Sequence, residues 1–300
     1  MEITDVLEFL ENNSVHYEEN AGMADFTGFR AGRTCRLLII PDTKEQLISV
    51  VRFLRSNDHE YMLLGNGSNI FFGHDSDKTV ILTKKALSDL YLTDDGYIYA
   101  GAGVMLADVC RFAAKNSISG FENLYGIPGT VGGAVYMNAG AYGSETKDVI
   151  FGVHTLLGRS MREAEITNYD CRFSYRYSMF QESKAPVLGV LFQGVPGDRD
   201  TIEAAMKECM EKRRSKQPLE YPSCGSAFKR PAGYYAAALI EECGLKGKAV
   251  GGAEVSSKHA GFIINRDHAT PDDILELFSL VKNTVEEKKG VTLEPEVIIL

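Results

Sequence analysis

Long hydrophobic runs, paired cysteines and an excess of positive charge are all missing from this chain of 300 residues. No apolar stretch approaches the roughly 20 residues that cross a bilayer, which argues against a membrane protein. The six cysteines never stand in CxxC spacing, so neither a metal site nor a disulfide framework is expected. A net charge of -9 opposes binding to phosphate-rich nucleic acid.

The overall composition is typical of a soluble globular protein. Apolar residues make up 44% of the chain and charged residues 24%, which suits two or three domains with substantial cores. The opening MEITDVLEFLENN is acidic and shows neither the basic nor the apolar region of a secretory signal. We therefore expect a cytoplasmic protein, and a monomer is compatible with the sequence.

The order of periodic segments predicts three parts, residues 1–80, 81–200 and 201–300. The first opens as β-α-β, with a helix beginning at Thr43 and a buried strand at YMLLG. The second is an α+β unit of short strands with one helix at 106–116. A helix at 198–216 lies at the boundary of the third part. Beyond this helix, helices are predicted at 232–243 and after Thr270, and strands at 249–255 and 260–265. We expect the last strand, in 293–300, either to belong to this third part or to pack back on the preceding parts.

The most distinctive segment is 126–143, GIPGTVGGAVYMNAGAYG, which has six glycines, one proline and no charged side chain. Glycine lets peptide N–H groups approach a ligand closely, and several such dipoles can hold a pyrophosphate. The alternative is a tight packing loop of small residues.

A second glycine-rich loop, GNGSN at 65–69, directly follows the buried strand. The end of a strand is a usual place for ligands in α/β layers. Neither loop matches GxxxxGK[ST] or the dinucleotide spacing GxGxxG. Two neutral loops without lysine favour a large diphosphate cofactor held mainly by main chain.

Several motifs occur in a fixed order along the chain: GNGSN, GIPGTVGGAVYMNAGAYG, SYRYS, PSCGSAFKRP, KHAGFIIN and LEPEV. In this order, over about residues 26–300, the chain resembles the UDP-N-acetylenolpyruvoylglucosamine reductase family, in its shorter subclass. The ordered set is far more specific than any one motif.

The resemblance implies an α+β fold, with a two-part FAD-binding module of the vanillyl-alcohol-oxidase type and then a smaller α/β substrate-binding domain. It implies that NADPH reduces FAD, which passes hydride to the enolpyruvyl double bond of a UDP-sugar to give UDP-N-acetylmuramate. It implies catalytic roles for Arg176, Ser226 and Glu296. The implied cofactor-binding residues are Gly65, Asn66, Gly67, Ser68, Asn69, Gly101, Gly126, Ile127, Pro128, Gly129, Thr130, Gly132, Gly133, Asn138 and Gly140.

The chemistry of such a reaction asks for charge stabilisation and a proton donor. Arg176 stands in RFSYRYS, where extended geometry places Arg172, Ser174, Arg176 and Ser178 on one face. An arginine backed by aromatic residues suits a carboxylate. The alternative is a surface arginine on a strand.

Ser226 lies in a run of small residues, CGSA, where its hydroxyl can protonate a carbanion-like intermediate. Most serines in such turns only cap them, and no GxSxG pattern indicates a hydrolase. Cys224 is the rival donor. Glu296 lies in an apolar tail. A carboxylate that points inward there costs free energy unless it is paired or takes part in the reaction, and burial would raise its pKa. A side chain that points outward to solvent is the alternative.

Lys229 and Arg230, with the basic cluster at 212–216, offer cations for a UDP diphosphate, although such a cluster more often marks a solvated helix end. Arg33, Cys35 and Arg36 depart from the family pattern, and their charge is a candidate for adenine-side phosphates or NADPH. Two other functions stay open: an FAD-dependent oxidase or dehydrogenase of a small alcohol or hydroxy acid, and a non-catalytic flavin or nucleotide-sugar module.

Overall fold

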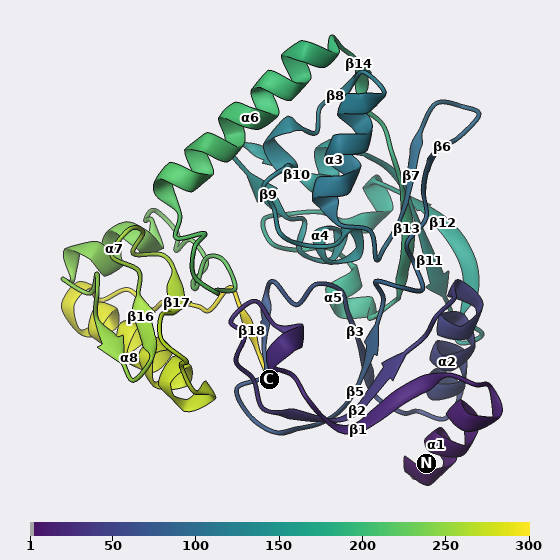
Figure 1. Ribbon diagram of the computed structural model, residues 1–300, viewed down its shortest axis with the longest axis horizontal. Coiled ribbons are helices and arrows are strands. Elements are labelled where there is room, and N and C mark those ends of the chain that lie inside the picture. Colours follow the sequence, from purple (N-terminus) through teal and green to yellow (C-terminus); the bar gives the residue numbers. More distant parts are fainter. Residues whose placement is uncertain (1–2) are drawn as a thin grey trace. The chain divides into compact units, whose positions relative to one another are not determined.

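The computed structural model describes residues 3–300, and helices and strands alternate along them (Figure 1). The chain divides into two units. Unit 1 comprises the residues up to Glu18 together with Leu37–Asn66 and Lys78–Glu211. Unit 2 comprises Glu19–Arg36, Gly67–Asp77 and Lys212–Leu300. The predicted α+β class is confirmed.

Local sequence signals place the longer helices well. The α-helices are α1 (Ile3–Asn12), α2 (Lys44–Ser56), α3 (Leu106–Lys115), α4 (Val131–Met137), α5 (Phe180–Ser183), α6 (Arg199–Lys216), α7 (Ala236–Glu242) and α8 (Pro271–Lys289). The 3-10 helices are η1 (Ala24–Phe26), η2 (Glu122–Leu124), η3 (Thr146–Val149) and η4 (Tyr169–Cys171). Thr43 and Thr270 cap α2 and α8 through their side chains, as predicted. Gly290 ends α8 at a φ of 68°, in the left-handed region.

The strands are mostly short. They are β1 (His16–Gly22), β2 (Thr34–Ile40), β3 (Tyr61–Leu64), β4 (Ile70–Phe71), β5 (Ser76–Leu82), β6 (Leu90–Leu92), β7 (Ile98–Gly101), β8 (Ile118–Ser119), β9 (Gly140–Ala141), β10 (Ser144–Glu145), β11 (Ile150–Leu157), β12 (Arg162–Thr167), β13 (Val187–Phe192), β14 (Val195–Pro196), β15 (Ala249–Val250), β16 (Ala253–Val255), β17 (Ile263–Asn265) and β18 (Ile298–Ile299).

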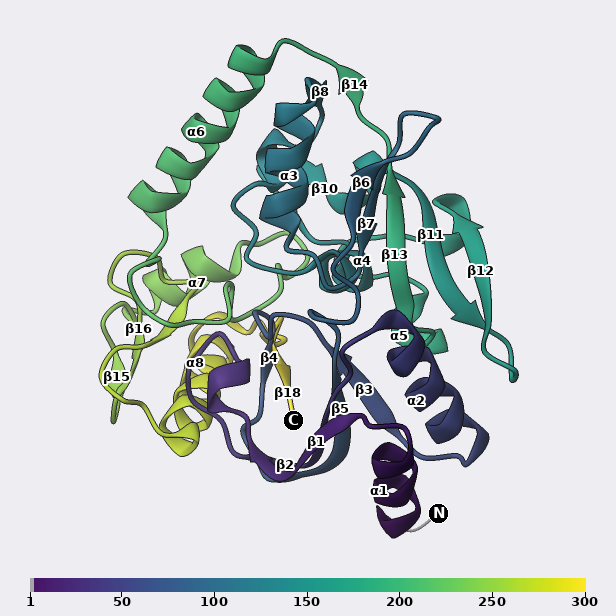
Figure 2. The same ribbon diagram turned by 45° about the vertical axis from the view of Figure 1, so that its right-hand side comes forward.

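The largest sheet lies in unit 1 and has the order β12-β11-β13-β7-β6, with every neighbouring pair antiparallel (Figure 2). Helix α3 packs against β7, and α4 packs against β13 and β7. Buried residues such as Val153, Leu188 and Val190 form the core under these helices. The sheet thus supports α4, which lies inside the glycine-rich segment.

A four-stranded sheet has the order β1-β2-β5-β3, and β3 and β5 run parallel. Helix α2 connects β2 to β3, which is the predicted β-α-β order. Its expected stripe of Leu47, Val50, Val51 and Leu54 is buried. Because β3 ends at Leu64, the loop 65–69 begins at the carboxyl end of a strand. The strand is less buried than predicted, since only Leu64 is buried and the three residues before it are half-buried.

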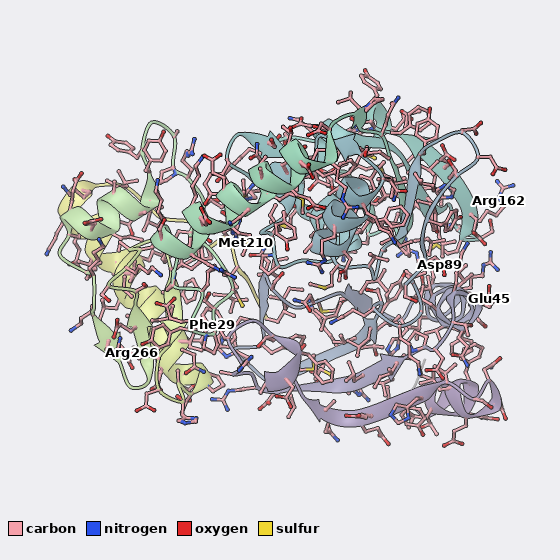
Figure 3. All side chains as sticks on the ribbon, turned by 45° about the horizontal axis from the view of Figure 1, so that its top comes forward. Phe29, Glu45, Asp89, Arg162, Met210 and Arg266 are labelled. Carbon is pink, nitrogen blue, oxygen red and sulfur yellow. The ribbon has the colours of Figure 1, made fainter. Side chains whose placement is uncertain are left out.

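Unit 2 contains the antiparallel sheet β15-β16-β17, with α8 packed against all three strands and α7 packed against α8. Phe29, labelled in Figure 3, is 1% exposed in the core of this unit. Its ring meets those of Phe71 and Phe278 edge-on, at centroid distances of 5.2 and 6.4 Å. The last strand, β18, pairs in parallel with β4 through Ile298 and Ile70.

Three sequence predictions of local structure need correction. Residues 131–137 form a helix inside the glycine-rich segment rather than a loop throughout. Helix α7 begins at Ala236 rather than 232, because Gly233 at a φ of 76° interrupts the segment before it. The stretch 172–178 is a turn and no strand, because Arg172 and Arg176 both have positive φ.

Candidate functional site

The two glycine-rich loops meet within unit 1. A Cβ added to Gly65 would overlap Thr130 Oγ1, so the loops approach each other as closely as glycine permits. The Asn66 amide donates to the carbonyl oxygen of Pro128 at 2.7 Å, and Lys84 Nζ donates to Asn66 Oδ1 at 3.1 Å. Gly65 and Asn66 of the first loop therefore lie beside Thr130 and Pro128 of the second.

Some glycines of the segment serve packing, which was the alternative reading of it. The N–H groups of Val131 and Gly132 donate to the carbonyl oxygens of Val104 and Ala102, at 2.8 and 2.9 Å. A Cβ added to Gly132 would lie 2.9 Å from Ala102 Cβ. These contacts fix α4 on the sheet. They also use the N–H groups of Val131 and Gly132 in hydrogen bonds within the protein.

Gly133 behaves differently. It is exposed, and the nearest atom to an added Cβ would be Thr130 Oγ1 at 3.6 Å, an ordinary van der Waals distance. Neither the backbone conformation nor the surrounding chain requires glycine there. The position is open to a ligand that approaches the main chain.

Two further predicted glycines are needed by the chain itself. A Cβ at Gly101 would lie 2.5 Å from the carbonyl oxygen of Leu87, and one at Gly140 would lie 2.6 Å from that of Ser144. Both contacts are with main chain, which cannot move aside as a flexible side chain can. Their lack of a side chain therefore has a structural cause.

Residues 67–69 of the first loop belong to unit 2. Gly67 has a φ of 62°, and an added Cβ would overlap the carbonyl oxygen of Phe26, so only glycine fits. Asn69 Nδ2 donates to the carbonyl oxygen of Glu296 at 3.1 Å. The loop thereby supports the main chain at one of the predicted catalytic residues.

Ser226 and Glu296 lie on adjacent segments. Ser226 forms a bridge with Phe262, and Ala227 accepts a hydrogen bond from the N–H of Glu296 at 2.9 Å. Both Ser226 and Glu296 are half-buried. Glu296 was expected inside the last strand; it stands in a bend before β18 instead.

Cys224 is a poor rival to Ser226 as a proton donor. Its side chain is 2% exposed, and Sγ donates to the carbonyl oxygen of Ile70 at 3.4 Å. Burial raises the pKa of the Cys224 thiol to about 12. The thiol is thus enclosed by the protein and already engaged.

Arg176 occupies a tight turn in unit 1. The N–H of Ser174 donates to Tyr177 and that of Tyr177 donates to Ser174, at 3.1 and 3.2 Å, so Tyr175 and Arg176 form the tip. The Arg176 guanidinium lies over the Tyr175 ring, 5.0 Å from its centroid. The predicted alternation of faces is wrong, but aromatic support for Arg176 is present.

Asn138, a predicted cofactor contact, is fully buried and directs its side chain at protein atoms. Its Nδ2 donates to Glu145 Oε2 and to the carbonyl oxygen of Ser174, both at 3.0 Å, and Oδ1 accepts from the N–H of Lys147 at 3.2 Å. Asn138 has a φ of 41° and ends α4. It therefore ties the end of α4 to the turn that carries Arg176.

The predicted substrate cations have neighbours of their own. Lys229 Nζ lies 3.3 Å from Glu294 Oε2, and the Arg230 guanidinium lies 4.5 Å from the centroid of the Tyr235 ring. The basic cluster at 212–216 forms the last turn of α6, where cations complement the helix carbonyl end.

The idea that Arg33 meets phosphates is not supported by its contacts. Its Nη2 donates to both carboxylate oxygens of Asp272, at 2.8 Å to each, and its Nε donates to the carbonyl oxygen of Gly73 at 3.2 Å. Asp272 raises the pKa of Arg33 through this pair. Cys35 is buried, and Arg36 is exposed on β2.

Sequence reasoning missed Gln181, which helps to shape the turn around Arg176. Gln181 and Ser178 both donate to the carbonyl oxygen of Tyr136, at 2.9 and 2.8 Å. Neither the SYRYS motif nor hydrophobic periodicity marks Gln181. Only the nearness of a polar amide to the motif, five positions after Arg176, was available as a signal.

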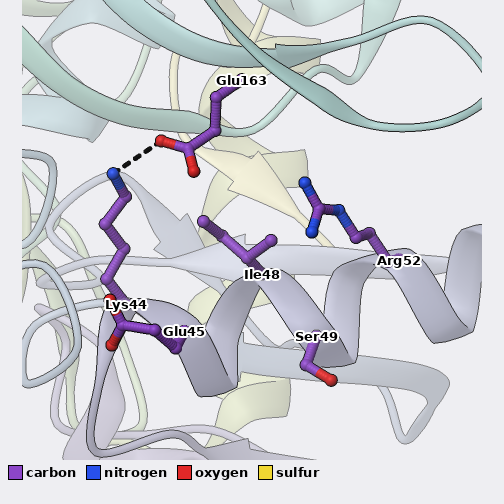
Figure 4. A pocket seen from close by; sticks show the side chains of 6 residues that line it. All are labelled: Lys44, Glu45, Ile48, Ser49, Arg52 and Glu163. Carbon is purple, nitrogen blue, oxygen red and sulfur yellow. Dashed lines mark hydrogen bonds and ion pairs between the residues drawn. The ribbon is translucent and has the colours of Figure 1, made fainter.

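A surface hollow of about 280 Å³ on unit 1 lies apart from these residues. It is lined by Lys44, Glu45, Ile48, Ser49, Arg52 and Glu163 (Figure 4). Lys44 is paired with Glu163 at 2.6 Å, and none of the six is a predicted site residue. We assign no function to the hollow.

Residues 3–300 contain neither a metal-binding cluster nor a helix able to span a membrane. No group of three or more His, Cys, Asp or Glu side chains in this range is arranged to hold a metal ion. No helix in the same range combines the length and apolarity that crossing a membrane requires.

Comparisons with known proteins agree over nearly the whole chain. Residues 217–300 match a family model described as UDP-N-acetylenolpyruvoylglucosamine reductase, C-terminal domain, and residues 35–161 match one described as FAD binding domain. Relatives named UDP-N-acetylenolpyruvoylglucosamine reductase occur in Caldanaerobacter subterraneus and Geobacillus thermodenitrificans. They are 41% and 44% identical to this chain, over 94% and 93% of it and 92% and 91% of their own lengths.

A solved structure is similar as well. The crystal structure of UDP-N-acetylenolpyruvylglucosamine reductase from Thermus caldophilus matches with a TM-score of 0.77 and 31% identity. The match covers 95% of this chain and 98% of that one.

Proposed function

The chain belongs to the UDP-N-acetylenolpyruvoylglucosamine reductase family, and on this premise we propose roles for its residues. The protein is an FAD-dependent oxidoreductase that uses NADPH to reduce the enolpyruvyl group of UDP-N-acetylenolpyruvoylglucosamine, giving UDP-N-acetylmuramate for peptidoglycan synthesis. The observation that carries this conclusion is 41% identity over 94% of the chain.

The glycine-rich loops fit FAD. We propose that Gly65–Asn69 and Gly126–Gly133 hold its diphosphate region, in keeping with their lack of charge. Gly133 supports this, because no neighbouring protein atom requires a glycine there and an added Cβ would occupy open space beside the main chain. When bound there, FAD would supply the hydride chemistry that links NADPH to the terminal alkene carbon of the substrate. Residues 1–80 and 81–200 are proposed as the two parts of the FAD module, and 201–300 as the substrate domain.

Ser226 is proposed as the proton donor. Hydride addition leaves negative charge on the neighbouring carbon, and Ser226 Oγ gives its proton to that carbon. The half-buried serine is held between the segments of Phe262 and Glu296. The main chain that carries the hydroxyl is therefore held in place before the proton moves.

Glu296 is proposed to help hold the intermediate or to relay a proton. Its main chain is fixed on both sides, by the bond from its N–H to Ala227 and by the bond from Asn69 to its carbonyl oxygen. These two bonds restrict where the carboxyl group can point. Such preorganisation favours a group that acts during the reaction.

Arg176 is proposed to bind the substrate carboxylate, which gains charge as hydride arrives. A guanidinium offers paired donors that match a carboxylate, and Tyr175 supports its face. Lys229 and Arg230 are proposed for the UDP diphosphate. The protein is further proposed to act in the cytoplasm. It is proposed to have no nucleic-acid partner, because its net charge is -9.

Visible spectra of the purified protein test the function. A flavin band should be present or should appear with FAD, bleach when NADPH is added without oxygen, and return when the enolpyruvyl UDP-sugar follows. A chain that stays colourless with FAD would be a binding module of another kind. A reduced flavin that only oxygen reoxidises would indicate an oxidase.

A further inference from the structure

The turn at Arg176 has a conformation that its own sequence does not favour. Arg176 has a φ of 55°, and Arg172, four positions earlier, has a φ of 50°. Residues that carry a Cβ avoid this region unless their surroundings hold them there. Something outside the turn must therefore fix Arg176.

Gln181 makes the contact that can do so. Its Nε2 donates to the carbonyl oxygen of Arg176 and to that of Tyr136, both at 2.9 Å. A primary amide has two N–H groups, so one side chain serves both carbonyls. Gln181 thus joins the main chain of Arg176 directly to the last turn of α4.

Neighbouring bonds make the Tyr136 carbonyl a firm anchor. Ser178, which is fully buried, donates its hydroxyl to the same oxygen at 2.8 Å. On the other side of the turn, Asn138 donates to the carbonyl oxygen of Ser174 at 3.0 Å. The end of α4 therefore holds the turn on both sides, and Gln181 is the part of this clamp that reaches Arg176 itself.

We propose that Gln181 is a positioning residue for the reductase reaction: it fixes the main chain of Arg176 so that the guanidinium is presented in one orientation. The proposal rests on the role proposed above for Arg176. The guanidinium already lies over the Tyr175 ring at 5.0 Å, so rotation of the Arg176 peptide would displace it from that ring. Gln181 itself need not touch substrate or cofactor.

Four variants of the FAD-loaded enzyme test this. Q181M removes both donors at similar length, Q181K restores donors of different chemistry, R176M removes the guanidinium, and Q181M/R176M combines the two changes. Q46M is the matched control, because Gln46 also donates to a main-chain carbonyl, that of Ser14, on the exposed side of unit 1.

The measurement is stopped-flow reoxidation of NADPH-reduced flavin by the enolpyruvyl substrate. We expect Q181M to slow reoxidation by about tenfold, as suits loss of hydrogen bonds that orient a catalytic group. Flavin reduction by NADPH should stay within about twofold of the parent, and Q181K should recover most of the lost rate. Because Gln181 acts through Arg176, the double variant should be no slower than R176M alone.

Each other outcome is decisive. Q181M that reoxidises like Q46M overturns the proposal, and slow reoxidation by R176M then leaves the proposed function intact. Effects of Q181M and R176M that multiply in full overturn it too, because Gln181 would act independently. Normal reoxidation by R176M removes the role of Arg176 and this proposal together. If Q181M does not retain FAD, Q181N, whose amide is too short to reach both carbonyls, takes its place.

Discussion

The N–H of Glu296 donates a hydrogen bond of 2.9 Å to the carbonyl oxygen of Ala227, the residue that follows Ser226. The bond is main chain to main chain, so it survives changes of either side chain. It places a carboxyl-bearing residue and a hydroxyl-bearing residue on paired segments of unit 2. Substitutions at Ser226 or Glu296 can therefore remove chemistry without removing the frame.

Replacing Ser226 by alanine tests the proton donor. We expect NADPH to reduce the flavin of S226A normally, while reoxidation by the enolpyruvyl substrate slows by about 10² to 10⁴, the range for a positioned acid. Stopped-flow absorbance of the flavin separates the two half-reactions. S279A, on the exposed side of α8, is the control. Unchanged reoxidation in S226A would remove Ser226 from this role.

Glu296→Gln keeps the size of the side chain and removes its carboxyl group. We expect the same half-reaction to slow, by about tenfold or more, because an amide cannot relay the proton. Thermal stability should stay near that of the parent. E287Q, on the exposed surface of α8, should reoxidise like the parent. An E296Q enzyme that reoxidises at the parental rate would contradict the assignment.

The sequence predicts those parts of the fold whose cause is local. Thr43 and Thr270 cap their helices through their own side chains, and the apolar stripe of α2 is buried as its spacing indicates. Helix α4 was missed because glycines oppose helix formation. Bonds from Val131 and Gly132 to carbonyls of a distant loop hold it in place, and such bonds leave no local signal.

In the candidate site, too, the sequence predicts what has a local cause and misses what tertiary contacts impose. The motifs indicate Ser226, Glu296 and Arg176 as catalytic candidates. The sequence predicts extended backbone around Arg176, however, where the structure has a turn. Its positive φ depends on Gln181 and Asn138, which belong to other segments. Local alternation cannot report a conformation that tertiary hydrogen bonds impose.

Two adjacent glycines of α4 should respond in opposite ways to alanine. In G132A the new methyl group would meet Ala102 Cβ at 2.9 Å, and overpacking of this kind costs about 1–3 kcal/mol. In G133A the methyl group meets nothing closer than 3.6 Å, and alanine favours a helix by about 0.5–1 kcal/mol. The apoprotein of G132A should therefore melt lower than the parent, and that of G133A at the same temperature or higher.

FAD titration of the same two variants tests the cofactor site. G133A should bind FAD about tenfold more weakly despite its sound fold, because the methyl group obstructs an approach to the main chain. G22A, where the added Cβ has open space, is the control for both measurements. Parental FAD affinity in G133A would mean that the cofactor does not approach α4 at this position.

The buried thiol of Cys224 makes stability depend on pH in a definite direction. Burial raises its pKa from 9.0 to about 12 in the folded protein, whereas the unfolded chain keeps the lower value. The folded-state pKa is the higher one, so the contribution is fully present below about pH 9 and is lost as pH rises toward 12. Denaturant unfolding at several pH values should show a falling free energy of unfolding above pH 9. C224A should lessen that fall, whereas a slope identical to the parent would show that Cys224 ionises equally well in the folded state.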